Sequence, residues 1–275
     1  MPGYVKTVEE LERIAAVVNP MRYVLDEVGI EFKTTWEFAR WALPPCLEPV
    51  GDRNANVADA AASVLSAECP HFDRFDADHV VLMCKYGDQT GSYILQSLHS
   101  TEGHVVCGRE LWGGPKKLGI ARVFHDGNHH YGYSERNGIR LVQISVETTG
   151  RDLAPTTTES RSFAVKMFPH AGGNGLQYPP SLNIWQGQLK TTSLREGAGT
   201  LKWGSSKFDH VSTIPIVSVA AGSVLKGEFV YAGLTQKELK DPDGVYARYL
   251  WGTYMDDPTA FSVPARWGAE VKVNR

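Results

Sequence analysis

Short apolar segments separated by turn sequences recur from residue 79 onward, and they constrain the fold more than any other feature of the chain. Residues 80–84 form a continuous apolar run, residues 86–91 are rich in turn-forming side chains, and residues 92–98 form a second run, a pattern that predicts a β-hairpin. Further strands are predicted at residues 120–124, 131–134, 139–147, 162–168, 182–194, 199–203, 214–221 and 225–231. We therefore expect a mainly β (β-rich α+β) chain with a closed or strongly curved antiparallel, β-barrel-like core and a few peripheral helices.

Two short helices are predicted before this β-rich part. Thr7 and Glu10 form a capping box, and apolar residues follow at helical spacing, which predicts an amphipathic helix over residues 7–18 that ends at Asn19-Pro20. We expect this helix to pack onto the domain or onto a partner subunit. Thr35 is placed to cap a second helix, which Pro44-Pro45 would end.

Four segments have weaker patterns. Residues 21–33 indicate a strand or a pair of short strands, and the alanine-rich residues 58–67 fit either a helix or a strand of small residues. Residues 148–161 are predicted to form a surface loop, and residues 236–250 a weak helical or irregular stretch.

Composition and charge exclude several classes of function. A net charge of −3 gives no electrostatic basis for binding nucleic acid or anionic membranes. The four cysteines are far apart and form no Cys-x-x-Cys pair, so no zinc or redox motif is predicted. The sequence begins without the features of a secretory signal, and it contains no apolar run long enough for a membrane helix. We expect an intracellular, cytoplasmic protein with reduced thiols.

Lys116 and Lys117 are adjacent, follow Pro115 directly, and lie among small or apolar residues such as Trp112 and Leu118. An ordinary lysine pKa of ~10.4 would have to fall to about 7 for the amine to be a good nucleophile, a change of about 4.6 kcal/mol. A second ammonium about 7 Å away contributes roughly 2.4 kcal/mol at an effective dielectric constant of ~20. Burial would have to supply the remainder. The alternative is a pair of surface lysines in a turn.

The string from Gly108-Arg109-Glu110-Leu111 to Pro115-Lys116-Lys117-Leu118-Gly119 resembles the active-site segment of the acetoacetate decarboxylase family. The resemblance covers about residues 20–250 and is strongest at about 105–120. It implies that Lys116 forms a Schiff base with a β-keto acid and that Lys117 is the cationic neighbour credited with lowering its pKa. It also implies one β-barrel-like domain over residues 1–275, with an N-terminal helix at about 7–18 and a C-terminal extension at about 251–275.

The acid and the arginine that this family uses do not carry over cleanly. The acidic position falls on Ala77, so we assign the neighbouring Asp78 as the proton-transferring acid; a different gap would select Asp88 or Gln89. The arginine position falls near Leu25, and Arg22 is the nearest candidate. The remaining substrate-binding candidates are Trp112, Glu110 and Tyr93, although Glu110 fits an ion pair with Arg109 equally well. Loss of an anion-holding arginine predicts a substrate bulkier than acetoacetate.

These features predict a Schiff-base lyase that decarboxylates a β-keto acid through an imine on Lys116. The chemistry requires no cofactor, and the expected partners are a small keto acid or ketone and further copies of the chain in a homo-oligomer. One alternative is an aldolase or dehydratase that uses the same lysine. A second alternative, of another class, is a noncatalytic ligand-binding or noncovalent cyclisation barrel whose pocket is lined by residues such as Trp112, Tyr93 and Phe124.

His125, His129 and His130 cluster around one predicted turn. Histidines in this arrangement could ligate a metal ion, but a metal site also needs ligands from other elements, and the spacing identifies none. We therefore predict a polar hairpin tip and no metal site.

Overall fold

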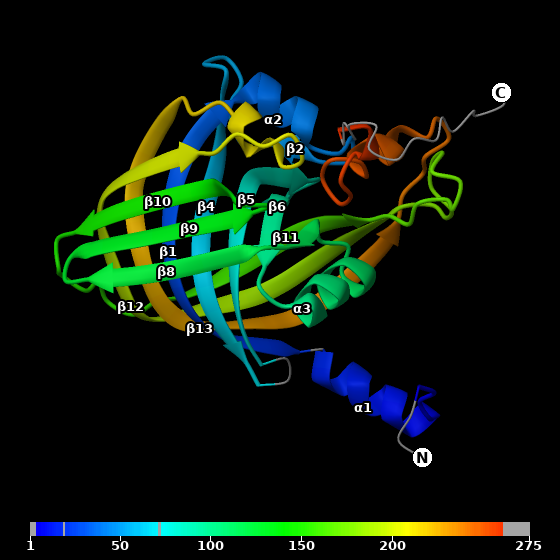
Figure 1. Cartoon of the computed structure of the whole chain (residues 1–275), viewed down its shortest axis with the longest axis horizontal. Helices are drawn as coiled ribbons and strands as arrows, with labels where there is room; N and C mark the ends of the chain where they lie inside the picture. Colours follow the sequence, from blue (N-terminus) through cyan, green and yellow to red (C-terminus); the bar gives the residue numbers. More distant parts are fainter. Residues whose placement is uncertain (1–3, 19, 71–72, 261–275) are drawn as a thin grey trace, which may run out of the picture.

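The computed structural model describes residues 4–18, 20–70 and 73–260, and most of them lie in long, curved β-strands (Figure 1). The helices are α1 Val8–Val18, α2 Trp36–Ala42 and α3 Glu102–Val106, with a π-helical turn η1 Cys107–Leu111 and 3-10 turns η2 His210–Thr213, η3 Val245–Tyr249 and η4 Pro258–Ala260. The strands are β1 Met21–Thr35, β2 Glu48–Pro49, β3 Gly51–Asp52, β4 Val57–Cys69, β5 Asp73–Tyr86, β6 Gln89–His99, β7 Lys116–Leu118, β8 Ile120–Asp126, β9 His129–Arg136, β10 Ile139–Thr148, β11 Thr157–Lys166, β12 Ser181–Trp203 and β13 Ser218–Glu238. None of the described helices is long and apolar enough to cross a membrane.

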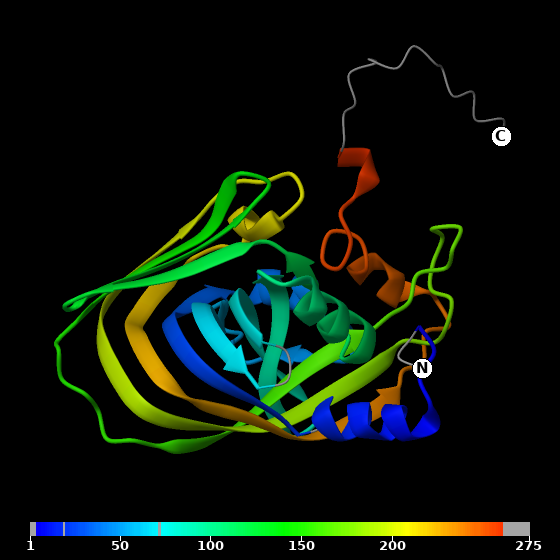
Figure 2. The same ribbon diagram turned by 60° about the horizontal axis from the view of Figure 1, so that its bottom comes forward.

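The strands form one 13-stranded sheet, in which ten strands follow each other in the order β11-β6-β5-β4-β1-β13-β12-β10-β9-β8. The short strands β2, β3 and β7 pair outside this path with β5, β4 and β6, respectively. The sheet curls until β11, which pairs in parallel with β6, also pairs antiparallel with β12, so that the strands from β11 to β12 close into a ring. Figure 2 shows these strands curving around a common interior, with α3 near one end. The prediction of a mainly β fold with a strongly curved sheet is confirmed.

Two expected strand boundaries are wrong for one physical reason. Residues 182–194 and 199–203 belong to the single strand β12, and residues 218–238 form the single strand β13. The breaks expected between these strands are absent, and the glycines there lie inside the ladder, where Gly197 pairs with Gly222. A side chain on Gly199 would meet the Gly222 Cα at 3.1 Å, so glycine is needed because the two backbones approach closely.

Other weakly patterned segments are now assigned. The alanine-rich segment lies in strand β4, where alternate residues are buried. The expected loop at residues 148–161 is too long, because β11 begins at Thr157 and pairs with Lys190 of β12. Residues 236–250 contain the end of β13 and the 3-10 turn η3.

The three-stranded segment β8-β9-β10 folds over the outer face of the ring and creates the main core. Residues on the outer face of β4 and β5, such as Val64 and Val80, pack there with Leu141 and Ile144 of β10. The opposite face of β1, β4 and β5 points into the ring. Because successive residues of a strand point to opposite faces, the parity of each residue decides whether it joins this core or the interior of the ring.

The capping box of α1 is confirmed. The Glu10 amide donates to Thr7 Oγ1 at 3.2 Å, and the Thr7 amide donates to Glu10 Oε2 at 2.8 Å. No described residue of α1 is buried, and Val8, Leu11 and Ile14 are exposed, so most of the apolar face does not pack onto the domain as one alternative expected. Val18, the last residue of the helix, is partly buried against the core cluster that contains Tyr23. Figure 1 shows α1 extending away from the sheet. The predicted end of this helix at Asn19 lies outside the described residues.

Candidate active site

Lys116 lies at the start of the short strand β7, which pairs in parallel with β6 so that Lys116 is opposite Ser97. The segment before it runs from α3 directly into the π-helical turn η1 and then into Trp112. Such π-helical turns are rare and often occur at functional sites. This arrangement directs the Lys116 side chain toward the interior of the ring, where it lines a cavity.

Two glycines of the segment are required by close packing, Gly108 against the Lys116 side chain and Gly113 against Lys166. A Cβ on Gly108 would lie 2.1 Å from Lys116 Cδ and 2.8 Å from Lys116 Nζ. Gly113 has a φ of +76° and lies against the Lys166 backbone, where a Cβ would be 2.7 Å from the Lys166 Cα. The Gly114 amide donates to the Gly108 carbonyl at 2.8 Å, which closes the turn above the lysine.

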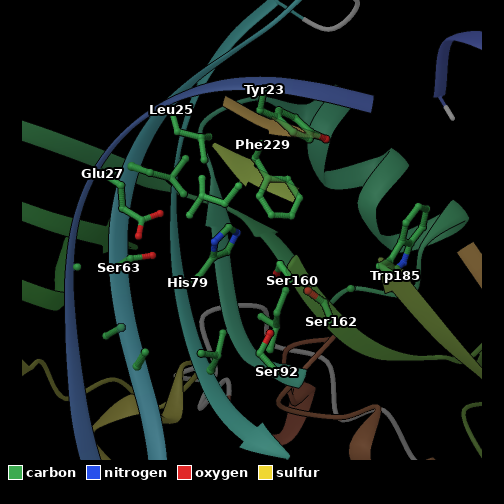
Figure 3. Close-up of a pocket in the computed structure, with 18 of the residues that line it drawn as sticks. Tyr23, Leu25, Glu27, Ser63, His79, Ser92, Ser160, Ser162, Trp185 and Phe229 are labelled. Atoms are coloured by element: carbon green, nitrogen blue, oxygen red, sulfur yellow. The ribbon is translucent and has the colours of Figure 1, made fainter. Parts of the chain in front are cut away.

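The cavity has a volume of about 400 Å³, within the range of pockets that hold drug-sized ligands. One part of its wall is aromatic, and its members are Tyr23, Phe75, Trp112, Trp185, Phe229 and Tyr231. The other part carries Glu27, Ser63 and His79, with further serines across the cavity (Figure 3). The cavity is therefore mainly apolar with a polar region at one side.

Burial dominates the electrostatics of Lys116. Lys116 is only 9% exposed. Among the described residues, no carboxylate forms an ion pair with its ammonium group. Burial lowers the pKa of Lys116 to about 8, and the nearby Cys107 opposes this only in part. The ammonium lies 5.3 Å from the centre of the Trp112 ring. A substantial fraction of the Lys116 amine is therefore uncharged near pH 8.

Lys117 points to the opposite face of β7 and lines a different cavity. Its ammonium lies 3.2 Å from Asp209 and 3.1 Å from Asp256, and Arg136 bridges the same two carboxylates. Burial raises the pKa of Asp256, but hydrogen bonds from Arg136 and Lys117 outweigh it and hold that pKa below its usual value. Lys117 is thus neutralised on the far side of the strand and does not act as a like-charge neighbour in the cavity.

Three histidines, His79, His99 and His104, are close enough to Lys116 for its charge to affect them. The rings of His99 and His104 stack with centroids 5.9 Å apart, and the ring of His79 lies 5.9 Å from that of His99. Burial, followed by the charge of Lys116, lowers the pKa of His79 to about 3 and that of His104 to about 4, and the pKa of His99 falls well below its usual value. These rings are therefore neutral at physiological pH and add no positive charge beside the amine.

Glu27 is the carboxyl group of the polar region. It is half-buried on β1, and burial raises its pKa to about 7, although a hydrogen bond with Ser63 acts in the opposite direction. In Figure 3 the Glu27 carboxyl and the Ser63 hydroxyl lie side by side at the cavity wall.

Comparison with known proteins identifies the family of the chain. A family model described as acetoacetate decarboxylase matches residues 13–239. The chain belongs to the acetoacetate decarboxylase family. An acetoacetate decarboxylase of Burkholderia vietnamiensis is 22% identical over 234 residues, which cover 80% of this chain and 92% of that protein. One of Burkholderia ambifaria is 22% identical over 181 residues, which cover 62% of this chain and 73% of that protein.

Solved structures show that the fold is shared. The enduracididine biosynthesis enzyme MppR superimposes with a TM-score of 0.69 at 18% identity, covering 80% of this chain and 88% of that chain. The acetoacetate decarboxylase of Legionella pneumophila gives a TM-score of 0.67 at 17% identity, covering 82% and 88%. Membership of the acetoacetate decarboxylase family supports an enzyme of the lyase type.

The structure brings only part of the expected site together. Trp112 lines the cavity beside Lys116, as expected. Asp78, expected as the acid, faces the outer core: it is fully buried and accepts hydrogen bonds from Gln96, Ser134 and the Leu98 amide. Its neighbour His79 faces the cavity instead, because the two residues have opposite parity on β5.

The other three substrate-binding candidates also lie away from the cavity. Arg22 is on the outer face of β1, paired with Glu228 at 2.7 Å. Glu110 is exposed on η1 and forms no ion pair with Arg109 in the described chain. Tyr93 is buried in the outer core, whereas Ser92 beside it lines the cavity. In place of these residues the cavity presents Glu27, His79 and His99, which the sequence analysis missed.

The histidine cluster at the β8–β9 turn forms hydrogen bonds within the protein. His125 Nδ1 lies 2.7 Å from His130 Nδ1, and His125 Nε2 lies 3.0 Å from Asp26. Within the described residues no group of three histidine, cysteine or acidic side chains is arranged to hold a metal ion.

We expect the pKa of Lys116 to depend more on the apolar wall than on Lys117. Lys117→Met should change the pKa of Lys116 by less than about 2, and Trp112→Ser should raise it at least as much. The measurement is the pH dependence of labelling of Lys116 by an amine-reactive reagent, read by peptide mass spectrometry. Lys117→Met should also destabilise the fold, by about 3 kcal/mol, because it leaves buried carboxylates short of a partner. A pKa near 10 in Lys117→Met, with no change in Trp112→Ser, would show like-charge repulsion to be dominant.

Gly108→Ala should displace the Lys116 side chain, because the added methyl group overlaps its Cδ and Cε atoms. We expect labelling of Lys116 at pH 8 to change at least fivefold, while the circular dichroism spectrum stays that of the parent. Gly103→Ala is the matched control, since a Cβ there meets nothing within 4 Å. Equal labelling of all three proteins would contradict the steric role of Gly108.

Proposed function

We propose that this protein is a Schiff-base-forming carbon–carbon lyase that decarboxylates a β-keto acid bulkier than acetoacetate. The observation that carries the proposal is the environment of Lys116: a buried amine with a lowered pKa, in a cavity, without a carboxylate partner among the described residues. A lysine in such a place can be a nucleophile toward a carbonyl carbon near neutral pH. Membership of the acetoacetate decarboxylase family supports the same chemistry.

The reaction follows from the neutral amine. Lys116 Nζ attacks the ketone carbon, and loss of water gives a cationic imine. The bond to the carboxylate then breaks, its electron pair moves into the imine to form an enamine, and carbon dioxide leaves. Protonation of the enamine carbon and hydrolysis release the ketone and restore the amine.

His79 and His99 are the groups placed to carry protons in these steps. Both line the cavity, and both are close enough for the charge of Lys116 to lower their pKa. His99 Nε2 is engaged with Ser97 Oγ at 2.9 Å, whereas His99 Nδ1 has no hydrogen-bond partner among the described residues. A neutral imidazole can accept a proton at one ring nitrogen while it gives up the proton of the other, so it can relay protons without forming the imidazolium that the lowered pKa disfavours.

The cavity favours loss of a carboxylate over its tight binding. None of the described residues that line it is an arginine, so the substrate carboxylate finds no cation other than Lys116 itself. Once Lys116 has become a cationic imine, decarboxylation neutralises both charges. Low local polarity favours that change because it disfavours separated charges.

A second candidate function is an aldol or dehydration reaction through the same imine. It is favoured by the structural similarity to MppR, which has been solved with pyruvate and with a condensation product of pyruvate and imidazole 4-carboxaldehyde. Product analysis after incubation with β-keto acids, and separately with pyruvate plus aldehydes, distinguishes the two reactions.

Lys116→Ala and Lys116→Arg should abolish turnover, by at least about 10³-fold, since neither side chain forms an imine at neutral pH. In the parent protein, borohydride reduction with a substrate ketone should leave a covalent adduct on Lys116. Trapping should rise with pH through about 8, because below that pH the amine is protonated. The exposed Lys85→Arg is the matched control. Turnover of Lys116→Arg within tenfold of the parent would refute the role of Lys116.

Acetoacetate should be a poor substrate, with kcat/KM below roughly 10⁴ M⁻¹s⁻¹. A four-carbon acid leaves much of the cavity of about 400 Å³ unfilled and finds no arginine there. A longer acid such as 3-oxooctanoate should react at least tenfold better in kcat/KM, measured as carbon dioxide release. Faster reaction with acetoacetate than with the longer acid would contradict this expectation.

A further inference from the structure

The side chains of Glu27, Ser63 and Ser223 surround the space that Gly29 leaves in the cavity wall, and we call this group of residues the notch. Ser63 of β4, Gly29 of β1 and Ser223 of β13 are direct neighbours in the sheet, so they form a row across three strands. Glu27 is two residues from Gly29 and therefore on the same face. Because Gly29 has no side chain, Glu27 Oε1 and the Ser223 hydroxyl come within 3.3 Å and 3.4 Å of where its Cβ would lie. The notch thus gathers a carboxyl and two hydroxyl groups.

This polar group is not used by the rest of the protein. Arg22 and Asp26, its neighbours on β1, form ion pairs on the outer face. Within the described chain no cation pairs with Glu27, whose one side-chain hydrogen bond is to Ser63. A carboxyl group left half-buried without a cation destabilises a fold, so its presence in a cavity points to a ligand.

The notch and Lys116 lie in different parts of the same cavity. Lys116 contacts Trp112, whose ring lies 5.2 Å from that of Trp185. Figure 3 shows Trp185 at the opposite side of the cavity from Glu27 and Ser63, with His79 between them. His79 is the direct neighbour of Ser63 in the sheet, and it is close enough to Lys116 for that charge to affect it. One ligand can therefore span from the amine to the notch.

We propose that the notch formed by Glu27, Ser63 and Ser223 binds a hydrogen-bond donor, a hydroxyl or an ammonium group, at the distal end of the substrate. The inference rests on the proposed function, since it takes the ketone at Lys116 as the other end. The substrate class is then a keto acid whose chain runs past the aromatic wall and ends in a donor. A terminal carboxylate is excluded by repulsion from Glu27, and a terminal methyl group leaves the notch without a partner.

The test compares methyl ketones that differ only at the far end: heptan-2-one, 7-hydroxyheptan-2-one, 7-(dimethylamino)heptan-2-one and 6-oxoheptanoate. Binding is measured by calorimetry on Lys116→Met, which cannot form the imine, so recognition is read separately from chemistry. The hydroxyl and ammonium ketones should bind at least tenfold more tightly than the other two. Longer homologues with six intervening methylene groups extend the test to a wider span.

Substitutions in the Lys116→Met background assign the preference to Glu27. Glu27→Leu should reduce the hydroxyl and ammonium advantages to within twofold. Glu27→Gln should retain the hydroxyl advantage and lose the ammonium one. Glu31→Gln is the matched control, since Glu31 is an exposed residue of the same strand at the cavity rim. If Glu27→Leu does not fold, as judged by thermal unfolding, the ammonium arm of Glu27→Gln decides.

Equal binding of all four ketones, or an unchanged ranking in the Glu27 variants, overturns the inference. Borohydride trapping in the parent protein reports separately on the proposed function. Trapping on Lys116 without any end-group preference would refute the notch alone. An end-group preference without trapping would refute the imine chemistry and leave the notch as the recognition site of a binding protein.

Discussion

Burial of one ammonium group without a counter-ion is the constraint on which the site depends. The change in the Lys116 pKa from 10.5 to about 8 corresponds to roughly 3 kcal/mol in favour of the neutral amine. The surrounding chain is shaped to keep the amine there. Gly108 leaves room for the side chain, β6 holds the strand that carries it, and Trp112 closes the wall. Burial also lowers the pKa of the nearby histidines, so these rings stay neutral and place no second positive charge beside the amine.

The segment that follows the matched family region contributes to this environment from the other side. The family match ends at residue 239, yet Tyr254 donates from its hydroxyl to the Gly113 and Val165 carbonyls at 2.6 Å and 2.8 Å. Asp256 joins the ion pairs of Lys117 and Arg136. These contacts fix the glycine turn and the strand that present Lys116. The geometry of the reactive side of β7 is thus supported by residues that never reach the cavity.

The sequence was enough to predict the curved β fold, the capped helices and a lysine in apolar surroundings, because each depends on a local pattern. The remaining site residues depend on which strands become neighbours and in which register. Asp78 and His79 differ by one position, and that step moves a side chain from the cavity to the outer core. Glu27 meets Ser63 only because β1 pairs with β4 in one particular register.

The alternation of side chains along β7 separates the two adjacent lysines into different compartments. The amine of Lys116 faces a cavity with an apolar wall, while the ammonium of Lys117 forms ion pairs with two acidic residues on the other side of the strand. Two adjacent residues of the same type therefore have different environments and different roles in the structure. A related chain could replace the second lysine by any group that bridges those acids and still keep a reactive amine. When a function is assigned to a chain of this family, a lysine that faces a cavity with an apolar wall is therefore stronger evidence than the presence of two adjacent lysines in the sequence.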